Sequence, residues 1–438
     1  MSNWSTTTIG EYCDLLNGYA FKSKDFIEMY LPDTLPILKI KNVANGDANL
    51  NDAVYHKTDS KLEKYKVEKG DILIALTGNH PIDKTQVVGG VSQYKLSKPA
   101  LLNQRVGKIY STNDKKLSNQ FLYYYLTWSR TQFYIGNQSS GSASQANISK
   151  ADVLGIPIYT PPIDEQNEIA QTLSNLDQKI ALLRQQNETL EQIAQTLFKR
   201  WFVDLEFPDE NGNPYKSSGG KMIASELGEI PEGWKVYHLS EFVQIHNGYS
   251  YKGDELQESN EALVTLKNFD RTGGFRYDGF KELVSDRYKE KHLVYPGDLI
   301  VAHTDLTQDA EVLGNPALIL ENPKYEKLII SMDLVKVESK EPLISTEFLY
   351  YLMKDRNFKS HCVGYSNGTT VLHLSKSAIP EYEIALPSDL ALAQKLGIVT
   401  KSTISKIANN TKEMNTLINL RDTLLPKLMG GEIRVKME

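Results

Sequence analysis

The sequence predicts two related α/β (α+β) globules separated by a long antiparallel two-helix coiled coil, with a pseudo-two-fold internal repeat. Three observations lead to this fold class. Short motifs recur in the same order at a nearly constant offset of roughly 227 residues. The first part of each copy is rich in short runs of Val, Ile, Tyr and Gly, and each copy ends in a long segment with heptad spacing.

The repeat is visible in several separate motifs. NGYAFK at 17–22 recurs as NGYSYK at 247–252, and GDIL at 70–73 recurs as GDLI at 297–300. FLYY stands at 121–124 and again at 348–351. Because the motifs keep one order, chance similarity is a poor explanation. We interpret the chain as two copies of one unit of roughly 225 residues.

The first part of each copy predicts a globule. Runs such as those at 36–40, 70–75 and 297–302 are typical of short strands bounded by turns, whereas 121–129 and 348–354 indicate helices. Closely spaced Pro and Gly residues mark a linker between the copies. The predicted organisation is a first globule at 1–160, a central helix at 161–205, a linker at 206–233, a second globule at 234–388, and a C-terminal helix with a tail at 389–438.

The coiled coil is predicted from the spacing of apolar residues. From 164 to 202 the chain contains no Gly and no Pro, and apolar residues follow one another at alternating steps of four and three. Asn187 fills the polar seam position, where it can fix the register. This helix would span roughly 58 Å at about 1.5 Å per residue. The second helix, about 389–429, ends at Gly430 and Gly431. The predicted seam consists of Ile169, Leu173, Leu176, Ile180, Leu183, Asn187, Leu190, Leu197, Ile407, Met414, Leu417 and Leu424.

Length and composition exclude several classes of protein. The 438 residues, 40% of them hydrophobic, suffice for two or three folded domains. There is no apolar run of about 18 residues and no signal peptide, so we expect a cytoplasmic protein without a membrane contact. Cys13 and Cys362 alone form neither a zinc site nor a disulfide framework. Phosphate-loop, GxGxxG and HExxH motifs are absent from the sequence, so we expect no bound metal and no catalytic residue.

Polar segments that recur in both copies are candidates for contacting nucleic acid. The loop 136–147 is rich in Asn, Gln and Ser, and its counterpart at 364–370, which His373 follows, is also polar. A turn after the Gly-Asp strand and a short basic segment recur as well. For each of these segments, the alternative to a nucleic-acid contact is an ordinary solvated surface. The candidate contacts are Lys39, Lys41, Asn42, Asn79, His80, Lys84, Gln138, Ser139, Ser142, Gln145, Asn147 and Lys150 in the first copy, and Lys267, Asn268, Arg271, His303, Thr304, Ser366, Asn367, Thr369, Thr370, His373 and Lys376 in the second.

Three further segments resemble the specificity subunit of type I restriction–modification systems. SELGEIPEGWKV at 225–236 is similar to the start of that family's second recognition domain. PPIDEQ at 161–166 is similar to the start of its first long helix, and LRDTLLPKLMGGEI at 420–433 resembles its C-terminal signature. The resemblance covers nearly the whole chain.

The resemblance implies a function in DNA recognition without catalysis. Each globule would read one half of an asymmetric bipartite site in double-stranded DNA, while the coiled coil sets the spacing and docks two modification (methyltransferase) subunits. S-adenosylmethionine, ATP and Mg are then expected on partner subunits, which include restriction (translocase/nuclease) subunits. The alternative is a coiled-coil scaffold that binds proteins and never DNA, which the formal net charge of −6 favours slightly.

Overall fold

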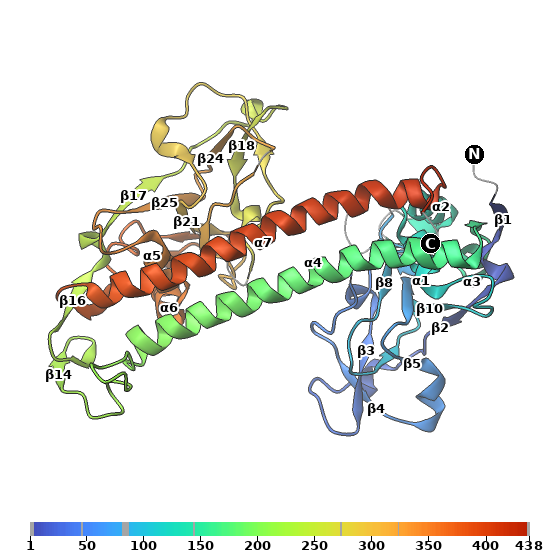
Figure 1. Cartoon of the computed structure of the whole chain (residues 1–438), viewed down its shortest axis with the longest axis horizontal. Helices are drawn as coiled ribbons and strands as arrows, with labels where there is room; N and C mark the ends of the chain where they lie inside the picture. The colour runs from blue at the N-terminus through green and yellow to red at the C-terminus, as the bar shows by residue number, and fades with distance from the viewer. Residues whose placement is uncertain are drawn as a thin grey trace. The chain divides into compact units, whose positions relative to one another are not determined.

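The computed structural model describes residues 4–44, 47–80, 87–142, 145–271, 274–322 and 324–435. The chain divides into two compact units (Figure 1). The first unit contains the residues up to Ala181 together with those from Asn415 onwards, and the second contains Leu182 to Met414. Both long helices pass from one unit into the other, so each unit consists of one globule and a segment of each helix.

The first unit contains two four-stranded sheets and three short helices. One sheet has the order β2-β10-β6-β8 and the other β4-β3-β9-β5, while β1 pairs with β13. Their bounds are β1 Ser5–Thr8, β2 Cys13–Asn17, β3 Thr34–Leu38, β4 Tyr55–Lys57, β5 Lys66–Val67, β6 Ile72–Ala75, β8 Val91–Gln93, β9 Ala100–Leu102, β10 Val106–Ser111 and β13 Pro157–Thr160, with helices α1 Asn119–Thr127, α2 Ser129–Gln138 and α3 Lys150–Leu154.

The second unit repeats this topology strand for strand. Its sheets have the orders β17-β25-β21-β23 and β19-β18-β24-β20, and β16 pairs with β28. The bounds are β16 Trp234–His238, β17 Val243–Asn247, β18 Glu261–Val264, β19 Lys281–Glu282, β20 Leu293–Val294, β21 Leu299–Ala302, β23 Pro316–Leu318, β24 Lys327–Ile330, β25 Leu334–Ser339 and β28 Glu383–Pro387, with helices α5 Thr346–Lys354 and α6 Arg356–Gly364. The linker adds a hairpin of β14 Met222–Ser225 and β15 Gly228–Pro231. The predicted internal repeat is confirmed.

The Gly-Asp motif precedes a strand that is buried on both faces, which explains its unbroken apolar run. In β6, Ile72 and Ile74 pack in one core with α1, whereas Leu73 packs in another core with strands of the second sheet. In β21 the same alternation sends Leu299 and Val301 towards α5, and Ile300 towards β18 and β24. Each globule is therefore layered as helices, sheet and second sheet.

The recurring NGY motif has a steric cause. The backbone N–H of Tyr19 donates to the carbonyl of Leu102 at 2.8 Å. This bond holds the backbone of Gly18 close to the segment that follows Leu102. A Cβ atom on Gly18 would lie 2.1 Å from the carbonyl oxygen of Asn103, and one on Gly248 would lie 1.9 Å from that of Ser331. Both glycines are therefore required by close backbone approach.

The two long helices are α4, Ile163–Phe198, which continues into a π-helical turn at Lys199–Val203, and α7, Ala391–Met429 (Figure 1). They pair in antiparallel fashion within each unit. In the first unit Arg421 Nη1 lies 2.9 Å from Asp177 Oδ1, and in the second Asn187 Nδ2 donates to Thr411 Oγ1 at 3.1 Å. In the part of the chain that the structure describes, no helix has the length and apolar character to cross a membrane.

The predicted seam residues differ in what they contact. Ile169, Leu173, Ile180 and Leu183 are buried, and the remaining seam positions of both helices are half-buried. Ile169 and Leu173 belong to the core of the first globule, which also includes Leu428 of α7. The seam near the start of α4 therefore joins helix to globule as well as helix to helix.

Candidate nucleic-acid interface

In the first unit, two candidate segments that are distant in sequence form one small sheet. Its strands are β7 Thr77–Gly78, β12 Gln145–Asn147 and β11 Ser140–Ser142, in the order β11-β12-β7. Asn147 stands opposite Thr77, whose hydroxyl donates to Asn147 Oδ1 at 2.7 Å. The turn after the Gly-Asp strand and the polar loop are thus parts of a single surface.

The second unit builds the equivalent sheet from the equivalent segments. Its strands are β22 Thr304–Asp305, β27 Leu372–Leu374 and β26 Ser366–Asn367. His373 stands opposite Thr304, as Asn147 stands opposite Thr77 in the first unit. Asn147 and His373 therefore occupy matching positions, and both are exposed.

Most of the predicted contacts on these two sheets are accessible. In the first unit Gln138, Gln145, Asn147 and Lys150 are exposed, and Asn79, His80 and Ser139 are half-buried. In the second unit Asn367, Thr369, Thr370, His373 and Lys376 are exposed, and His303 and Ser366 are half-buried. Lys84 and the side chain of Ser142 lie outside the described residues.

Three predicted contacts are wrong because their side chains are buried and hold turns together. Asn42, 1% exposed, accepts from the N–H of Lys39 at 3.0 Å and donates to the carbonyl of Asn51 at 3.0 Å. Asn268, fully buried, accepts from the N–H of Thr265 at 2.8 Å. Thr304, 4% exposed, donates its hydroxyl to Asp333 Oδ1 at 3.0 Å.

Several of the remaining candidates already have partners within the protein. Ser139 donates its hydroxyl to the carbonyl of Gly136 at 2.6 Å and Ser366 to that of Val363 at 2.7 Å, so both help to end helices. Lys150 pairs with Asp14 at 2.5 Å and Lys41 with Asp52 at 3.5 Å. Lys39 lies 4.4 Å from the ring centroid of Phe26, and burial together with the charge of Lys41 lowers its pKa. Lys267 is exposed.

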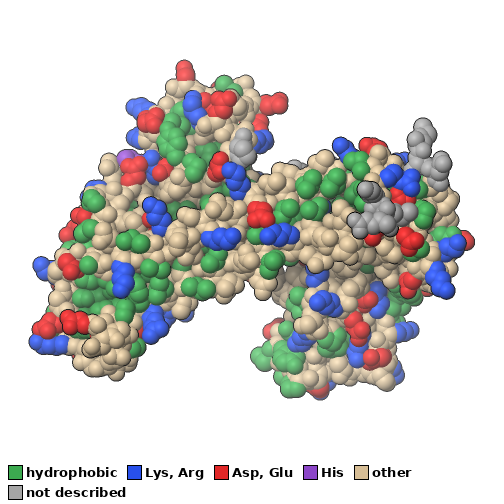
Figure 2. Space-filling view, viewed as in Figure 1, with side chains coloured by type: hydrophobic (Ala, Val, Ile, Leu, Met, Phe, Trp, Pro, Cys, Tyr) green, Lys and Arg blue, Asp and Glu red, His purple; other side chains and the backbone are tan. Residues whose placement is uncertain are grey.

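Basic groups gather on the sheet of the second unit. Burial lowers the pKa of His303, and the neighbouring His373 and Lys376 lower it further. On the face drawn in Figure 2, however, blue and red side chains are interspersed over the described residues.

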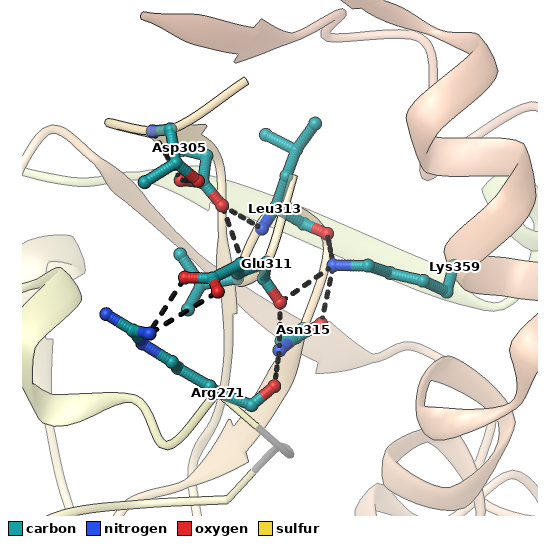
Figure 3. A network of polar contacts seen from close by, with 8 residues as sticks. Arg271, Asp305, Glu311, Leu313, Asn315 and Lys359 are labelled. Atoms are coloured by element: carbon teal, nitrogen blue, oxygen red, sulfur yellow. Dashed lines mark hydrogen bonds and ion pairs between the residues drawn. The ribbon is translucent and has the colours of Figure 1, made fainter. Parts of the chain in front are cut away.

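Sequence reasoning missed a polar network beside this sheet (Figure 3). Arg271 Nε lies 3.3 Å from Glu311 Oε2, and Asn315 Nδ2 donates to the carbonyl of Glu311 at 3.1 Å. Lys359 of α6 donates to the carbonyl of Leu313 at 2.6 Å. The only sequence signal was Arg271 itself, since the other members lie in segments without a recognisable motif.

The described residues contain no group of three or more His, Cys, Asp or Glu placed to hold a metal ion. Both cysteines are buried, and burial raises the pKa of each thiol to about 12. The sheets present amides, hydroxyls and a few cations instead. Such groups bind phosphates and base edges through hydrogen bonds.

Two related globules carrying matching polar sheets, joined to an antiparallel helix pair, define a duplicated recognition protein. The sequence matches the type I restriction modification DNA specificity domain over residues 1–192 and again over 231–418. The chain belongs to this family, the specificity subunits of type I restriction–modification systems, which recognise DNA sequence and are not catalytic.

Similar proteins include two that match over almost the whole chain. The type I restriction enzyme MjaIX specificity subunit of Methanocaldococcus jannaschii is 26% identical over 446 residues, covering 99% of this chain and 94% of the relative. The EcoKI specificity subunit of Escherichia coli is 23% identical and covers 98% of this chain and 89% of the relative. A crystal structure of the S subunit from M. genitalium shares the fold, with a TM-score of 0.56 at 19% identity, covering 100% of this chain and 97% of that one.

Proposed function

We propose that each globule reads one half of an asymmetric, bipartite target in double-stranded DNA. The observation that carries this proposal is the pair of matching three-stranded sheets, each of which joins two of the polar segments singled out in the sequence. Asn147 and His373 hold the same place on the two sheets but differ in chemistry. Two surfaces with the same backbone arrangement and different side chains suit two half-sites of different sequence.

The helix pair supplies the spacing between the half-sites in this proposal. A helix pair of fixed register would keep two reading surfaces at a fixed separation, and half-sites one turn of duplex apart lie about 34–36 Å from each other. The near two-fold repeat also offers similar docking sites to two copies of one partner, which we take to be modification subunits. Restriction subunits complete the assembly.

Cofactor chemistry is assigned to those partners. S-adenosylmethionine would be held by the modification subunits, and ATP with Mg by the restriction subunits. This chain contributes the choice of sequence.

The proposal that each globule reads its half-site independently is tested by exchanging residues 1–160 for the same segment of a relative. We expect methylome sequencing of the host to show a changed first half-site, an unchanged second half-site and an unchanged spacer. A change in both halves would contradict the proposal that each globule reads on its own.

A protein-interaction scaffold that does not bind DNA is the second candidate, because acidic and basic side chains are mixed on the surface of Figure 2. The two candidates differ in a simple measurement. The complex with modification subunits should retain a duplex carrying its target, and the retention should fall as salt rises because phosphate contacts release counterions. Retention that is absent at every salt concentration would favour the scaffold.

A further inference from the structure

We infer that the loop 306–311 of the second unit is a preformed base-reading element, and that Asp305 and Lys359 are the positioning residues that hold it. The loop connects β22 to the segment leading into β23, and it leaves the candidate sheet directly after Asp305. This inference rests on the proposed function and assigns part of the reading of one half-site to a segment that carries no basic residue.

Asp305 holds the loop from inside. It is 2% exposed, and its carboxylate accepts four hydrogen bonds, two from Thr307 of the loop and two from the residues that directly follow the loop. Oδ1 accepts from the N–H and from the hydroxyl of Thr307, both at 2.8 Å. Oδ2 accepts from the N–H of Val312 at 2.6 Å and from that of Leu313 at 3.1 Å. One buried carboxylate therefore ties the beginning of the loop to its end.

Lys359 fixes the far end of the loop to helix α6 (Figure 3). Its ammonium donates to the carbonyl of Leu313 at 2.6 Å, to Asn315 Oδ1 at 2.8 Å and to the carbonyl of Glu311 at 3.2 Å. Burial lowers the pKa of Lys359, although the charge of Asp305 opposes that shift. Three acceptors on one amine leave the loop end little freedom to move.

The first unit anchors its corresponding loop end at the same place in the repeat. Gln132 is the counterpart of Lys359, and its Nε2 donates to the carbonyl of Gly89 at 2.9 Å. Gly89 has φ +77° and Gly314 has φ +74°, and a Cβ atom on either would collide with the following helix, at 2.3 Å from Ile135 and 2.7 Å from Cys362. The anchor thus belongs to the fold of both units, whereas the sequences that precede it differ.

The outer side of the loop 306–311 presents several side chains to solvent. Leu306 is 72% exposed, and Gln308 and Asp309 are exposed, whereas Ala310 is 6% exposed. A leucine this exposed on a fixed loop does nothing for the core. In the major groove an aliphatic side chain can contact a thymine methyl, a Gln can pair with adenine through two hydrogen bonds, and a carboxylate can accept from cytosine. A loop that is ordered before binding also loses less entropy on binding.

The test uses the full complex with modification subunits and a library of duplexes randomised in both half-sites. Leu306→Ala/Gln308→Ala removes the reading side chains, and Val284→Ala, which shortens another exposed side chain of the same unit (51% exposed), is the matched control. We expect the double variant to lose discrimination about tenfold at one or two base pairs of one half-site. The other half-site and the control should match the unsubstituted complex.

The positioning role has its own readout. Lys359→Met, which removes all three donated bonds, should keep the preferred bases and lower discrimination in the same half-site. Lys359→Gln, which installs the side chain of the first repeat, should restore most of it. If Lys359→Met discriminates between bases as well as the unsubstituted chain does, and its melting curve shows that it is folded, the role of Lys359 is refuted.

Failure of the inference differs from failure of the proposed function. If the unsubstituted complex selects a bipartite site and Leu306→Ala/Gln308→Ala selects it equally well, the loop does not read bases. If that variant instead no longer copurifies with modification subunits, the loop is a protein-docking segment and the inference is also overturned. If the unsubstituted complex shows no sequence selection at all, the proposed function itself fails.

Discussion

The polar layer inside the helix pair of the second unit offers the sharpest test of how these helices are held in register. Asn410 is 1% exposed, and its Nδ2 donates to Asn187 Oδ1 at 2.9 Å. Asn187 in turn donates to Thr411 Oγ1 at 3.1 Å. Within the described residues, Asn410 Oδ1 is buried without a hydrogen-bond partner. A buried amide that is only partly satisfied favours one alignment of the helices at a cost in stability.

Replacing either asparagine alone should therefore cost more than replacing both. Asn187→Leu leaves the Asn410 amide buried with only a 3.4 Å contact to Gln186 Oε1, and an orphaned buried polar group costs about 1–3 kcal/mol. Asn410→Leu should cost less, because half-buried Asn187 can still turn to water. Asn187→Leu/Asn410→Leu removes both amides and adds apolar contact, so its stability should equal or exceed that of the unsubstituted protein.

Urea denaturation followed by helix circular dichroism measures the four members of this cycle. A loss of about 2 kcal/mol corresponds to roughly 4–8 °C in Tm for a domain of this size. We expect a coupling free energy of about 1–3 kcal/mol between the two positions. A double variant whose loss equals the sum of the two single losses would refute the reasoning, since it would show that the two amides do not satisfy each other.

Two further predictions concern the globule of the second unit. Gly248→Ala should destabilise it by about 1–3 kcal/mol, because the new Cβ would overlap the carbonyl of Ser331, whereas Gly253→Ala, whose Cβ would meet nothing within 4 Å, should cost far less in thermal melting. Burial opposes ionisation of Asp305, but hydrogen bonds from Val312, Thr307 and Leu313 outweigh it and lower its pKa. The stability that this carboxylate adds is then complete above its unfolded pKa and lost as pH falls through the lower folded value. Asp305→Asn should therefore be less stable than the unsubstituted protein by about 2 kcal/mol at pH 7, and the gap should close in urea melts taken progressively below about pH 4.

The sequence was sufficient to predict the duplication, the two long helices and the segments that form the candidate sheets. Those features leave local signals: recurring motifs at one offset, heptad spacing, and polar runs between apolar ones. Asn187 was recognisable for the same reason, because it interrupts an apolar seam. Its partner Asn410 was not, because Asn409 and Asn410 stand together and only the rotation of the helix decides which of them is buried.

The wrong contacts have a common physical cause. Asn42 and Asn268 follow lysines in short basic-looking segments, yet each amide closes a turn by bonding backbone groups of its own segment. An asparagine that satisfies buried backbone has the same sequence signature as one that reads a base. The loop held by Asp305 was missed for the converse reason, since its anchor Lys359 lies on a different helix and no local pattern connects the two.

Comparison of the two units distinguishes the backbone frame that they share from the exposed side chains that differ between them. Some positions that keep their residue between the repeats belong to the frame: Thr77 and Thr304 are buried, and Gly18 and Gly248 admit no side chain. The exposed position opposite each buried threonine differs, with an amide in one unit and an imidazole in the other. A duplicated frame that only docked one partner twice would favour equal surfaces at this place. The proposal of an asymmetric target expects this pattern, in which matching backbone frames of the two units carry different side chains at one exposed position.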